Sequence, residues 1–297
     1  MRLLLFGGTG QVGTELRSLG RAQGFQIAAP PRAVADFGDP NIIARLVNTD
    51  ASAVVVNAAG YTNVDRAESE EDLAFAINAE AAGALAVAAA ARQIPSIHIS
   101  TDYVFDGRKG SPYVEGDATA PINAYGRSKL AGEQAVCAAN PRHIILRTAW
   151  VYSPYGKNFV RTVLRLAAER DRLTIVADQR GCPTAARDVA LACLQIAQRC
   201  VAGPDRAPYG TYHFAGGGEA SWFEFASAIF ELAGDRVSCV PELVPIRTSD
   251  YPTPALRPAD TRLDCAAVVR EFGVSQRPWR EALTETLDRL LASKETS

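Results

Sequence analysis

The sequence predicts an α/β protein: a Rossmann-type, doubly wound parallel sheet with a smaller mixed α/β C-terminal substrate domain. A buried strand over Arg2–Phe6 runs directly into a glycine-rich turn that opens a helix. Apolar strands then alternate with helix-length stretches, which is the pattern of parallel βαβ units. After about residue 221 this alternation fades into proline-rich sequence. Together these observations predict a dinucleotide-binding sheet followed by a second, smaller lobe.

The first half of the chain supplies most of the expected sheet. The elements predicted there are a helix over 14–21, strands at 25–29, 53–56, 97–100 and 143–147, a helical stretch over about 70–92, and a helix carrying Tyr125 and Lys129. Each crossover is long enough for the right-handed connection that joins neighbouring parallel strands.

The second half is expected to be less regular. The elements predicted there are helices over 158–170, 186–199, 264–271 and 280–291, and strands at 173–176 and 212–214. Ser221 with Glu224 three residues later is typical of a capping box, so another helix should begin there. The segment 241–258 is rich in proline. We therefore expect residues 1–147 with 173–215 to bind the cofactor, and 148–172 with 216–297 to form the substrate domain.

Composition excludes several classes of protein. The 297 residues are 47% hydrophobic with a formal net charge of −2, which argues against a nucleic-acid partner or an anionic membrane surface. The N-terminal apolar run is too short for a signal peptide, and the longest apolar run, 81–91, is about half a membrane span. Six cysteines without a CxxC pair suggest neither zinc nor disulfides. We expect a cytoplasmic protein.

The turn after the first strand reads GGTGQVG. Glycines at 7, 10 and 13 permit a tight turn, a close approach of backbone to a pyrophosphate, and packing of the helix on the strand. The helix N-terminus adds N–H groups and the positive end of its dipole. A glycine-rich connection can also bind nothing, but the order strand, glycines, helix favours a dinucleotide site. Its expected members are Gly7, Gly10, Gln11, Val12 and Gly13.

The ends of the next two strands predict the rest of the cofactor site. The strand at 25–29 is followed by no acid to hold a ribose 2′-hydroxyl, and Arg32 is suited to a 2′-phosphate. NADPH is therefore slightly favoured, and NADH remains open, because Arg32 is equally compatible with a solvated surface charge. Asp36 and Phe37 are expected beside the adenine. The third strand ends in small residues that let backbone approach the cofactor; these are Ala58, Ala59, Gly60 and Thr62.

A tyrosine and a lysine four residues apart predict the catalytic centre. Tyr125 and Lys129 face the same way on one helix, and an ammonium group lowers the pKa of a neighbouring phenol. The spacing alone is common on ordinary helices. Here Thr101 stands at the tip of the fourth strand, where its hydroxyl is suited to bind the same carbonyl oxygen that Tyr125 protonates. A capping role for Thr101 is the simpler alternative.

Six motifs in order, GGTGQVG, NAAGYTNVDRAE, STDYVFDG, YGRSKLAGE, RTAWVYSPYGKNF and DQRGCPT, resemble the extended short-chain dehydrogenase/reductase family. The resemblance is specific over about residues 2–200. It implies an NAD(P)-binding Rossmann domain with Thr101, Tyr125 and Lys129 as the catalytic triad. It further implies that a smaller domain closes over a nucleotide-sugar, with Asp102, Tyr103 and Trp150 lining the sugar and base pocket.

The implied reaction is reduction of the 4-keto group of dTDP-4-dehydrorhamnose by NAD(P)H. In that reaction a hydride reaches C4 of the sugar, Tyr125 protonates the oxygen, and Lys129 holds the nicotinamide ribose and favours the tyrosinate. Sugar-nucleotide dehydratases of this family carry Asp-Glu after the threonine, whereas here Asp102 is followed by Tyr103. Dehydration is therefore disfavoured. Another nucleotide-sugar reductase or a C4 epimerase remains open, as does a regulatory subunit that binds nucleotide without turnover, such as the β subunit of methionine adenosyltransferase.

Assembly and metal content depart from the family pattern. Some of the similar reductases form a dimer around Mg²⁺ held by glutamates, and Glu15 matches the first of these. Arg187 stands at the second place, where a cation repels Mg²⁺. We therefore expect no bound structural Mg²⁺, and a monomer or weak homodimer.

Overall fold

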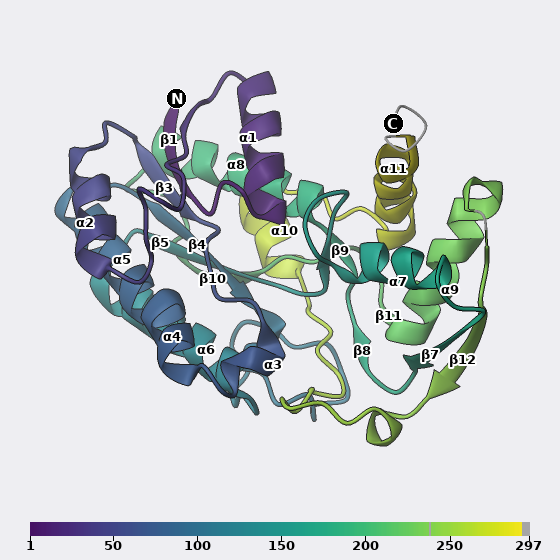
Figure 1. Cartoon of the computed structure of the whole chain (residues 1–297). Coiled ribbons are helices and arrows are strands. Elements are labelled where there is room, and N and C mark those ends of the chain that lie inside the picture. The colour runs from purple at the N-terminus through teal and green to yellow at the C-terminus, as the bar shows by residue number, and fades with distance from the viewer. Residues whose placement is uncertain (238, 293–297) are drawn as a thin grey trace.

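A parallel sheet of six strands lies at the centre of the larger lobe of the computed structural model, which describes residues 1–237 and 239–292 (Figure 1). The strand order is β10-β5-β4-β3-β1-β2, and every pairing is parallel. The strands are β1 (Arg2–Phe6), β2 (Gln26–Ala28), β3 (Val54–Asn57), β4 (Ser96–Thr101), β5 (His143–Thr148) and β10 (Gly210–His213). The chain leaves β1 toward β2 on one side and resumes at β3 on the other, which is the topological switch point of a doubly wound sheet. The predicted fold class is confirmed.

The alternating direction of the side chains along β1 shows why helices cover both faces of the sheet. Leu3 and Leu5 belong to a core shared with α1 (Gln11–Ala22), α8 (Ala186–Ala202) and α10 (Ala266–Phe272). Leu4 and Phe6 point the other way, into a core shared with α2 (Pro40–Thr49) and α5 (Ala81–Ala91). Successive side chains of a strand point to opposite faces, so a strand that is apolar throughout requires helices on both.

The helix between β2 and β3 was not anticipated from sequence. The side chain of Asp39 accepts from Asn41 N at 2.9 Å, and Pro40 opens helix α2. An aspartate cap followed by proline at the first helical position is a recognised start signal. Its apolar residues Ile43 and Val47 are fully buried.

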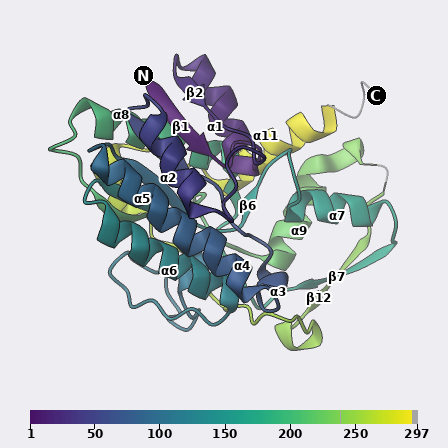
Figure 2. The same ribbon diagram turned by 60° about the vertical axis from the view of Figure 1, so that its left-hand side comes forward.

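A second group of elements lies beside the sheet in both ribbon views (Figures 1 and 2). It contains α7 (Phe159–Ala167), α9 (Trp222–Ala233) and α11 (Trp279–Ala292), with β7 (Arg172–Val176) paired in parallel to β12 (Glu242–Ile246). The remaining short strands are β6 (Val151–Tyr152), β8 (Arg180–Gly181), β9 (Thr184–Ala185) and β11 (Ala220–Ser221). These elements share one hydrophobic core built around Phe225 and Leu283.

Two expectations for this region need correction. The strand predicted at 173–176 was assigned to the cofactor-binding sheet, but β7 pairs with β12 and lies outside that sheet. The proline-rich segment 241–258 was expected to be irregular, yet it contains β12. Pro245 is tolerated in this strand because, at an edge position, the missing N–H of proline removes little of the hydrogen bonding between strands. The helix predicted at Ser221 is confirmed, with both bonds of its capping box present.

The helical run from Glu71 to Ala91 is the most apolar in the chain. It comprises α4 (Glu71–Phe75), a π-helical turn at Ala76–Glu80 and α5. Its 21 residues are long and apolar enough to cross a membrane by length and composition, and half of the most apolar window is buried inside the protein. It packs against α2 on one side and α6 (Ala124–Ala139) on the other, which is the environment of a core helix.

Candidate active site

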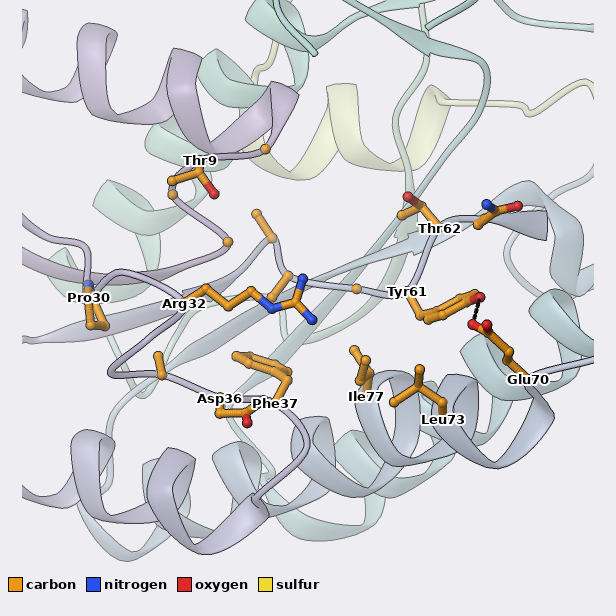
Figure 3. Close-up of a pocket in the computed structure, with 18 of the residues that line it drawn as sticks. Thr9, Pro30, Arg32, Asp36, Phe37, Tyr61, Thr62, Glu70, Leu73 and Ile77 are labelled. Atoms are coloured by element: carbon orange, nitrogen blue, oxygen red, sulfur yellow. Dashed lines mark hydrogen bonds between the residues drawn. The ribbon is translucent and has the colours of Figure 1, made fainter. Parts of the chain in front are cut away.

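A cavity of about 530 Å³ opens at the carboxyl ends of β1, β2 and β3 (Figure 3). Its wall comes from the glycine turn, the segment after β2, the segment after β3 and the start of the long helical run. The lining residues are Gly7, Gly8, Thr9, Gly10, Pro30, Arg32, Ala35, Asp36, Phe37, Ala58, Ala59, Gly60, Tyr61, Thr62, Asn63, Arg66, Glu70, Leu73 and Ile77. In an open α/β sheet this crevice is where a ligand binds.

The glycines of the turn serve different purposes. Gly7 has φ +78°, and a Cβ there would lie 2.4 Å from the backbone of Ala58. A Cβ on Gly13 would lie 2.1 Å from the carbonyl oxygen of Gly7, so Gly13 lets α1 pack against the turn. A Cβ on Gly10 would meet only Gly7 O, at 3.4 Å. Gly10 precedes the first turn of α1, whose N–H groups are free to bind an anion.

Nine of the predicted cofactor residues line this single cavity: Gly7, Gly10, Arg32, Asp36, Phe37, Ala58, Ala59, Gly60 and Thr62. The other five predicted cofactor residues, Gln11, Val12, Gly13, Tyr125 and Lys129, do not line it. Val12 packs into the core, and Gln11 turns toward the second lobe, where its Oε1 accepts from Ser153 at 2.8 Å and from Asn158 at 2.9 Å.

The far end of the cavity contains the features relevant to cofactor choice. The Arg32 side chain extends into the cavity above Phe37 (Figure 3). Asp36 accepts from Gly38 N at 2.9 Å, which ties its carboxylate to its own turn. Sequence reasoning missed Tyr61, whose hydroxyl donates to Glu70 at 2.5 Å across the cavity wall. Its position between Gly60 and Thr62, two predicted cofactor residues, was the available signal.

The tip of β4 brings three predicted substrate residues together. Thr101 Oγ1 donates to Asp102 Oδ1 at 3.0 Å and accepts from Tyr103 N at 3.2 Å. The Tyr103 ring meets the Tyr125 ring edge-on at 5.7 Å between centroids. Burial raises the pKa of Asp102 to about 6, against hydrogen bonds from Thr261 and Thr101 that lower it. Its carboxyl group is therefore poised between neutral and charged forms near neutral pH.

Helix α6 holds Tyr125 and Lys129 through contacts that sequence reasoning missed. Asn123 caps the helix by accepting from Gly126 N at 2.8 Å. Asn78, in the π-helical turn, accepts from Tyr61 N at 2.8 Å and donates to Ser128 Oγ at 2.9 Å. A π-helical turn often marks a functional position. Asn78 thus ties the cavity wall to the catalytic helix.

The electrostatics expected of the Tyr125–Lys129 pair need correction. The pKa of Tyr125 is raised to about 12, first by burial, while a hydrogen bond with Thr101 lowers it; the charge of Lys129 is not among the causes. The Lys129 Nζ instead donates to the carbonyl oxygen of Ile99 at 2.7 Å. Burial lowers the pKa of Lys129 to about 8, against the charge of Glu133. The Lys129 side chain thus ends at the backbone of β4, a contact that the helix spacing did not predict.

Trp150 follows β5 with an unusual backbone. Its φ of +45° is in the left-handed region that non-glycine residues seldom adopt, and such strain is concentrated at functional sites. The indole stacks on Trp222 with 3.5 Å between centroids and 5° between planes. A Cβ on Gly181 would lie 2.4 Å from the same indole. Trp222, a residue that sequence reasoning did not single out, is therefore part of the same aromatic surface.

The segment after β12 returns to the catalytic side of the sheet. Arg257 binds both carboxylate oxygens of Asp65 at 2.9 Å, and Asn123 Nδ2 donates to the carbonyl oxygen of Leu256 at 2.8 Å. Asp65 belongs to α3 (Val64–Ala67), directly after the cavity-lining residue Asn63. This contact joins the second lobe to the cavity wall beside the catalytic helix.

The surroundings of Glu15 do not suit a magnesium ion. Glu15 is only 1% exposed, and its carboxylate lies 3.7 Å from Arg187 Nη1 and 2.8 Å from Arg289 Nη2. Arg187 also contacts Glu285, with 2.9 Å between Nε and Oε1. Mg²⁺ requires oxygen ligands at near-ideal octahedral positions. The two guanidinium groups near Glu15 would repel such a cation.

Comparisons with known proteins agree with this geometry. The family model described as RmlD substrate binding domain matches residues 1–292. The chain is 45% identical to a dTDP-4-dehydrorhamnose reductase of Sinorhizobium fredii, with 95% of each chain covered. It is similar to a solved dTDP-4-dehydrorhamnose reductase of Clostridium acetobutylicum, with a TM-score of 0.89, 35% identity, and 98% of this chain and 99% of that one covered. A Bacillus anthracis dTDP-4-dehydrorhamnose reductase solved in complex with NADP also gives a TM-score of 0.89 at 35% identity, with 97% and 99% covered.

Proposed function

The chain belongs to the RmlD substrate binding domain family, and from that premise we propose that it reduces the 4-keto group of dTDP-4-dehydrorhamnose with NAD(P)H, giving dTDP-L-rhamnose. The observation that carries this proposal is the placement of Thr101, Tyr125 and Lys129. Tyr125 packs on the same small cluster as Tyr61, which lines the dinucleotide cavity. A proton donor thus stands beside the place where a reduced nicotinamide would supply a hydride.

The residues of the chain divide the chemistry among them. A bound NAD(P)H supplies the hydride to C4 of the sugar. Tyr125 gives its proton to the ketone oxygen as charge develops there, and Thr101, whose hydroxyl donates to Asp102 in this structure, would turn its hydrogen to that oxygen and orient it. Because burial raises the pKa of Tyr125, the tyrosinate left behind is costly. The charge of Lys129 does not affect the resting pKa of Tyr125, and we propose that it offsets part of that cost once the tyrosinate forms.

Cofactor binding is assigned to the cavity at the glycine turn. The N-terminal N–H groups of α1 would bind the pyrophosphate, for which Gly10 leaves room, and Phe37, which lines the cavity, would contact the adenine. Arg32 supports NADPH over NADH, because no carboxylate among the described residues forms an ion pair with it. The NADP complex of the Bacillus anthracis relative supports the same choice.

The substrate is assigned to the second lobe and the tip of β4. Asp102, Tyr103 and Trp150 are proposed to contact the sugar and thymine, and Trp222 extends the aromatic surface. The two-part division of the chain is retained, with β7 moved to the substrate side. Because arginines surround Glu15, we propose that the protein needs no structural Mg²⁺ and is a monomer or weak homodimer in the cytoplasm, with neither nucleic acid nor membrane as a partner.

Two other functions give distinguishable results. A C4 epimerase uses the same triad but returns its cofactor unchanged, so NADPH would not be consumed. A regulatory subunit would bind nucleotide without turnover. The intact triad and the aromatic surface favour the reductase, because binding alone requires neither.

A panel of substrates tests the proposal. Purified protein is given dTDP- and UDP-linked 4-keto sugars with NADPH or NADH, and loss of absorbance at the nicotinamide band is followed. We expect fastest turnover with dTDP-4-dehydrorhamnose and NADPH. A stronger response to a UDP sugar, or sugar inversion without cofactor loss, would move the assignment to a sister activity.

A further inference from the structure

A buried chain of hydrogen-bonding groups runs behind the catalytic helix. Ala59 N, in the cavity wall, donates to Asn57 Oδ1 at 3.1 Å. Asn57 Nδ2 lies 3.0 Å from His98 Nδ1, and His98 Nε2 lies 3.4 Å from Lys129 Nζ. Asn57 and His98 stand opposite each other on β3 and β4, and they are 1% and 2% exposed. The reaction described above assigns no role to either side chain.

The hydrogen bond from Ala59 fixes which way each group of this chain faces. A backbone N–H only donates, so the oxygen of the Asn57 amide must face Ala59, and the NH₂ group must face His98. An NH₂ group also only donates, so His98 Nδ1 accepts. Burial and the charge of Lys129 hold the pKa of His98 well below its usual value, so the ring is neutral. A neutral imidazole that accepts at Nδ1 carries its hydrogen on Nε2.

The Nε2 hydrogen of His98 is therefore directed at Lys129. A lysine ammonium has three donors and no acceptor, so it opposes this N–H, whereas a neutral amine has a lone pair that accepts it. The other partner of Lys129 is the carbonyl oxygen of Ile99, which accepts from either form. The hydrogen-bond arrangement thus favours the amine over the ammonium.

We propose that His98 is a positioning residue that acts on Lys129. Asn57 holds the His98 ring so that its Nε2–H points at Lys129, and this N–H disfavours the charged form of that lysine. His98 thereby sets the pH above which Tyr125 no longer has a positively charged neighbour. The inference rests on the proposed function only where it concerns turnover. The lowered pKa of Lys129, about 8, agrees with it, although burial is the main cause.

Other charged groups near α6 set the background against which His98 acts. The charge of Glu133, one turn along the helix, raises the pKa of Lys129. Glu133 is itself held at 2.7 Å by Arg147 of β5, and both are buried. The remaining titratable groups on the elements packed against α6 are Asp65 and Arg66 of α3, Glu71 and Asp72 of α4, Glu80 of the π-helical turn, Asp102 and Tyr103 after β4, and His143 of β5.

Lysine NMR tests the proposal without substrate or turnover. The chain contains only four lysines, so protein labelled at lysine Cε gives four signals, and a Lys129→Arg sample assigns the one of interest. In His98→Gln the side-chain amide can turn its oxygen to the ammonium. We expect the Lys129 signal to titrate about one pH unit higher than in the wild type.

A second variant and a matched control complete the experiment. In Asn57→Asp one carboxylate oxygen still accepts from Ala59 N, and the other can accept a hydrogen bond from His98 Nδ1. The ring hydrogen then moves from Nε2 to Nδ1, so Lys129 should again titrate at a higher pH. His213→Gln makes the same change at a fully buried histidine of β10 that contacts Arg147 instead, and should leave Lys129 unchanged. In an active enzyme, the pH at which kcat falls on the alkaline side of its pH profile should rise by the same amount. An unmoved Lys129 titration in both His98→Gln and Asn57→Asp would overturn the proposal, whether or not the protein turns over sugar.

Discussion

Each titratable side chain at the tip of β4 is shifted toward its neutral form. Burial raises the pKa of Tyr125 to about 12 and that of Asp102 to about 6, and it lowers the pKa of Lys129 to about 8. Desolvation penalises the charged form of any group, whichever its sign. Burial therefore makes each charge in the site more costly than in water, and the charges that develop in the reaction must be stabilised by neighbours.

The raised pKa of Asp102 makes the stability of the fold depend on pH. In the unfolded chain this carboxyl has a pKa of about 3.9, so the native state binds more protons between that value and about 6. Its stabilising contribution is complete below pH ~4 and is lost as pH rises through about 6. Relative to Asp102→Asn, the free energy of unfolding of the wild type should fall by on the order of 3 kcal/mol across this range.

Urea unfolding of both proteins between pH 4.5 and 7.5 measures that difference. The amide variant has no ionisable group at this position, so contributions from the rest of the chain cancel in the comparison. A difference between the two proteins that stays constant over the range would show that Asp102 keeps an ordinary pKa.

Arg32 should govern the choice between the two cofactors. Arg32→Ser removes the cation proposed to meet the 2′-phosphate, so the Kd for NADPH should rise about tenfold, as expected for one charge-assisted hydrogen bond, while that for NADH stays unchanged. Nicotinamide fluorescence titrations give both values. Arg45→Ser, an equally exposed change on α2 away from the cavity, is the control. Equal weakening of both cofactors would mean that Arg32 does not read the phosphate.

Sequence reasoning located residues by type and spacing, and it failed where a role depends on contacts across the sheet. Arg32 and Phe37 follow a strand and were found together in the cavity. His98 and Asn78 were missed because an isolated histidine or asparagine in an apolar run gives no local signal. Their partners lie 31 and 50 residues away along the chain, at Lys129 and Ser128.

At the scale of elements, the glycine turn and helix α1 form one unit. Gly13→Ala places a methyl group 2.1 Å from Gly7 O, so the helix must move off the turn. We expect a loss of about 1–3 kcal/mol in the free energy of unfolding and weaker NADPH binding. Gly10→Ala meets nothing closer than 3.4 Å, so it should cost about 1 kcal/mol or less while still weakening cofactor binding.

Urea unfolding and NADPH titration of the two variants separate packing from binding. If Gly13→Ala unfolds at the wild-type urea concentration, the close packing of α1 on the turn is not needed for the fold.

The elements that sequence missed were short or carried mixed signals. Helix α2 begins at Asp39-Pro40, a start signal that the sequence analysis did not use. Strand β12 contains Pro245, which argues against a central strand but is tolerated on an edge. The alternation of strands and helices predicted a doubly wound parallel sheet, whereas the order of its six strands came only from the structure.

At the scale of the whole molecule, arginines hold α1, α8 and α11 together around Glu15. Arg187 lies on α8 and Arg289 on α11, and both contact the buried carboxylate from α1. A buried charge left without a partner typically costs 3–5 kcal/mol. These two guanidinium groups offset the buried charge of Glu15 within one chain.

Sedimentation velocity tests this account of assembly. The wild type should sediment identically with EDTA and with Mg²⁺. Arg187→Glu replaces one of these cations by a carboxylate near Glu15 and Glu285, so it should lose several kcal/mol of stability, part of which Mg²⁺ restores. A wild-type dimer that dissociates in EDTA would contradict the metal-independent account.

The central claim is that the chain is a reductase, and the most direct measurement is NADPH consumption by purified protein with dTDP-4-dehydrorhamnose. We expect one NADPH oxidised for each dTDP-L-rhamnose formed, and a fall in kcat of about 10²- to 10⁴-fold in Tyr125→Phe with NADPH affinity retained. Wild-type protein that binds NADPH tightly but never oxidises it, or a Tyr125→Phe variant with full turnover, would contradict the claim.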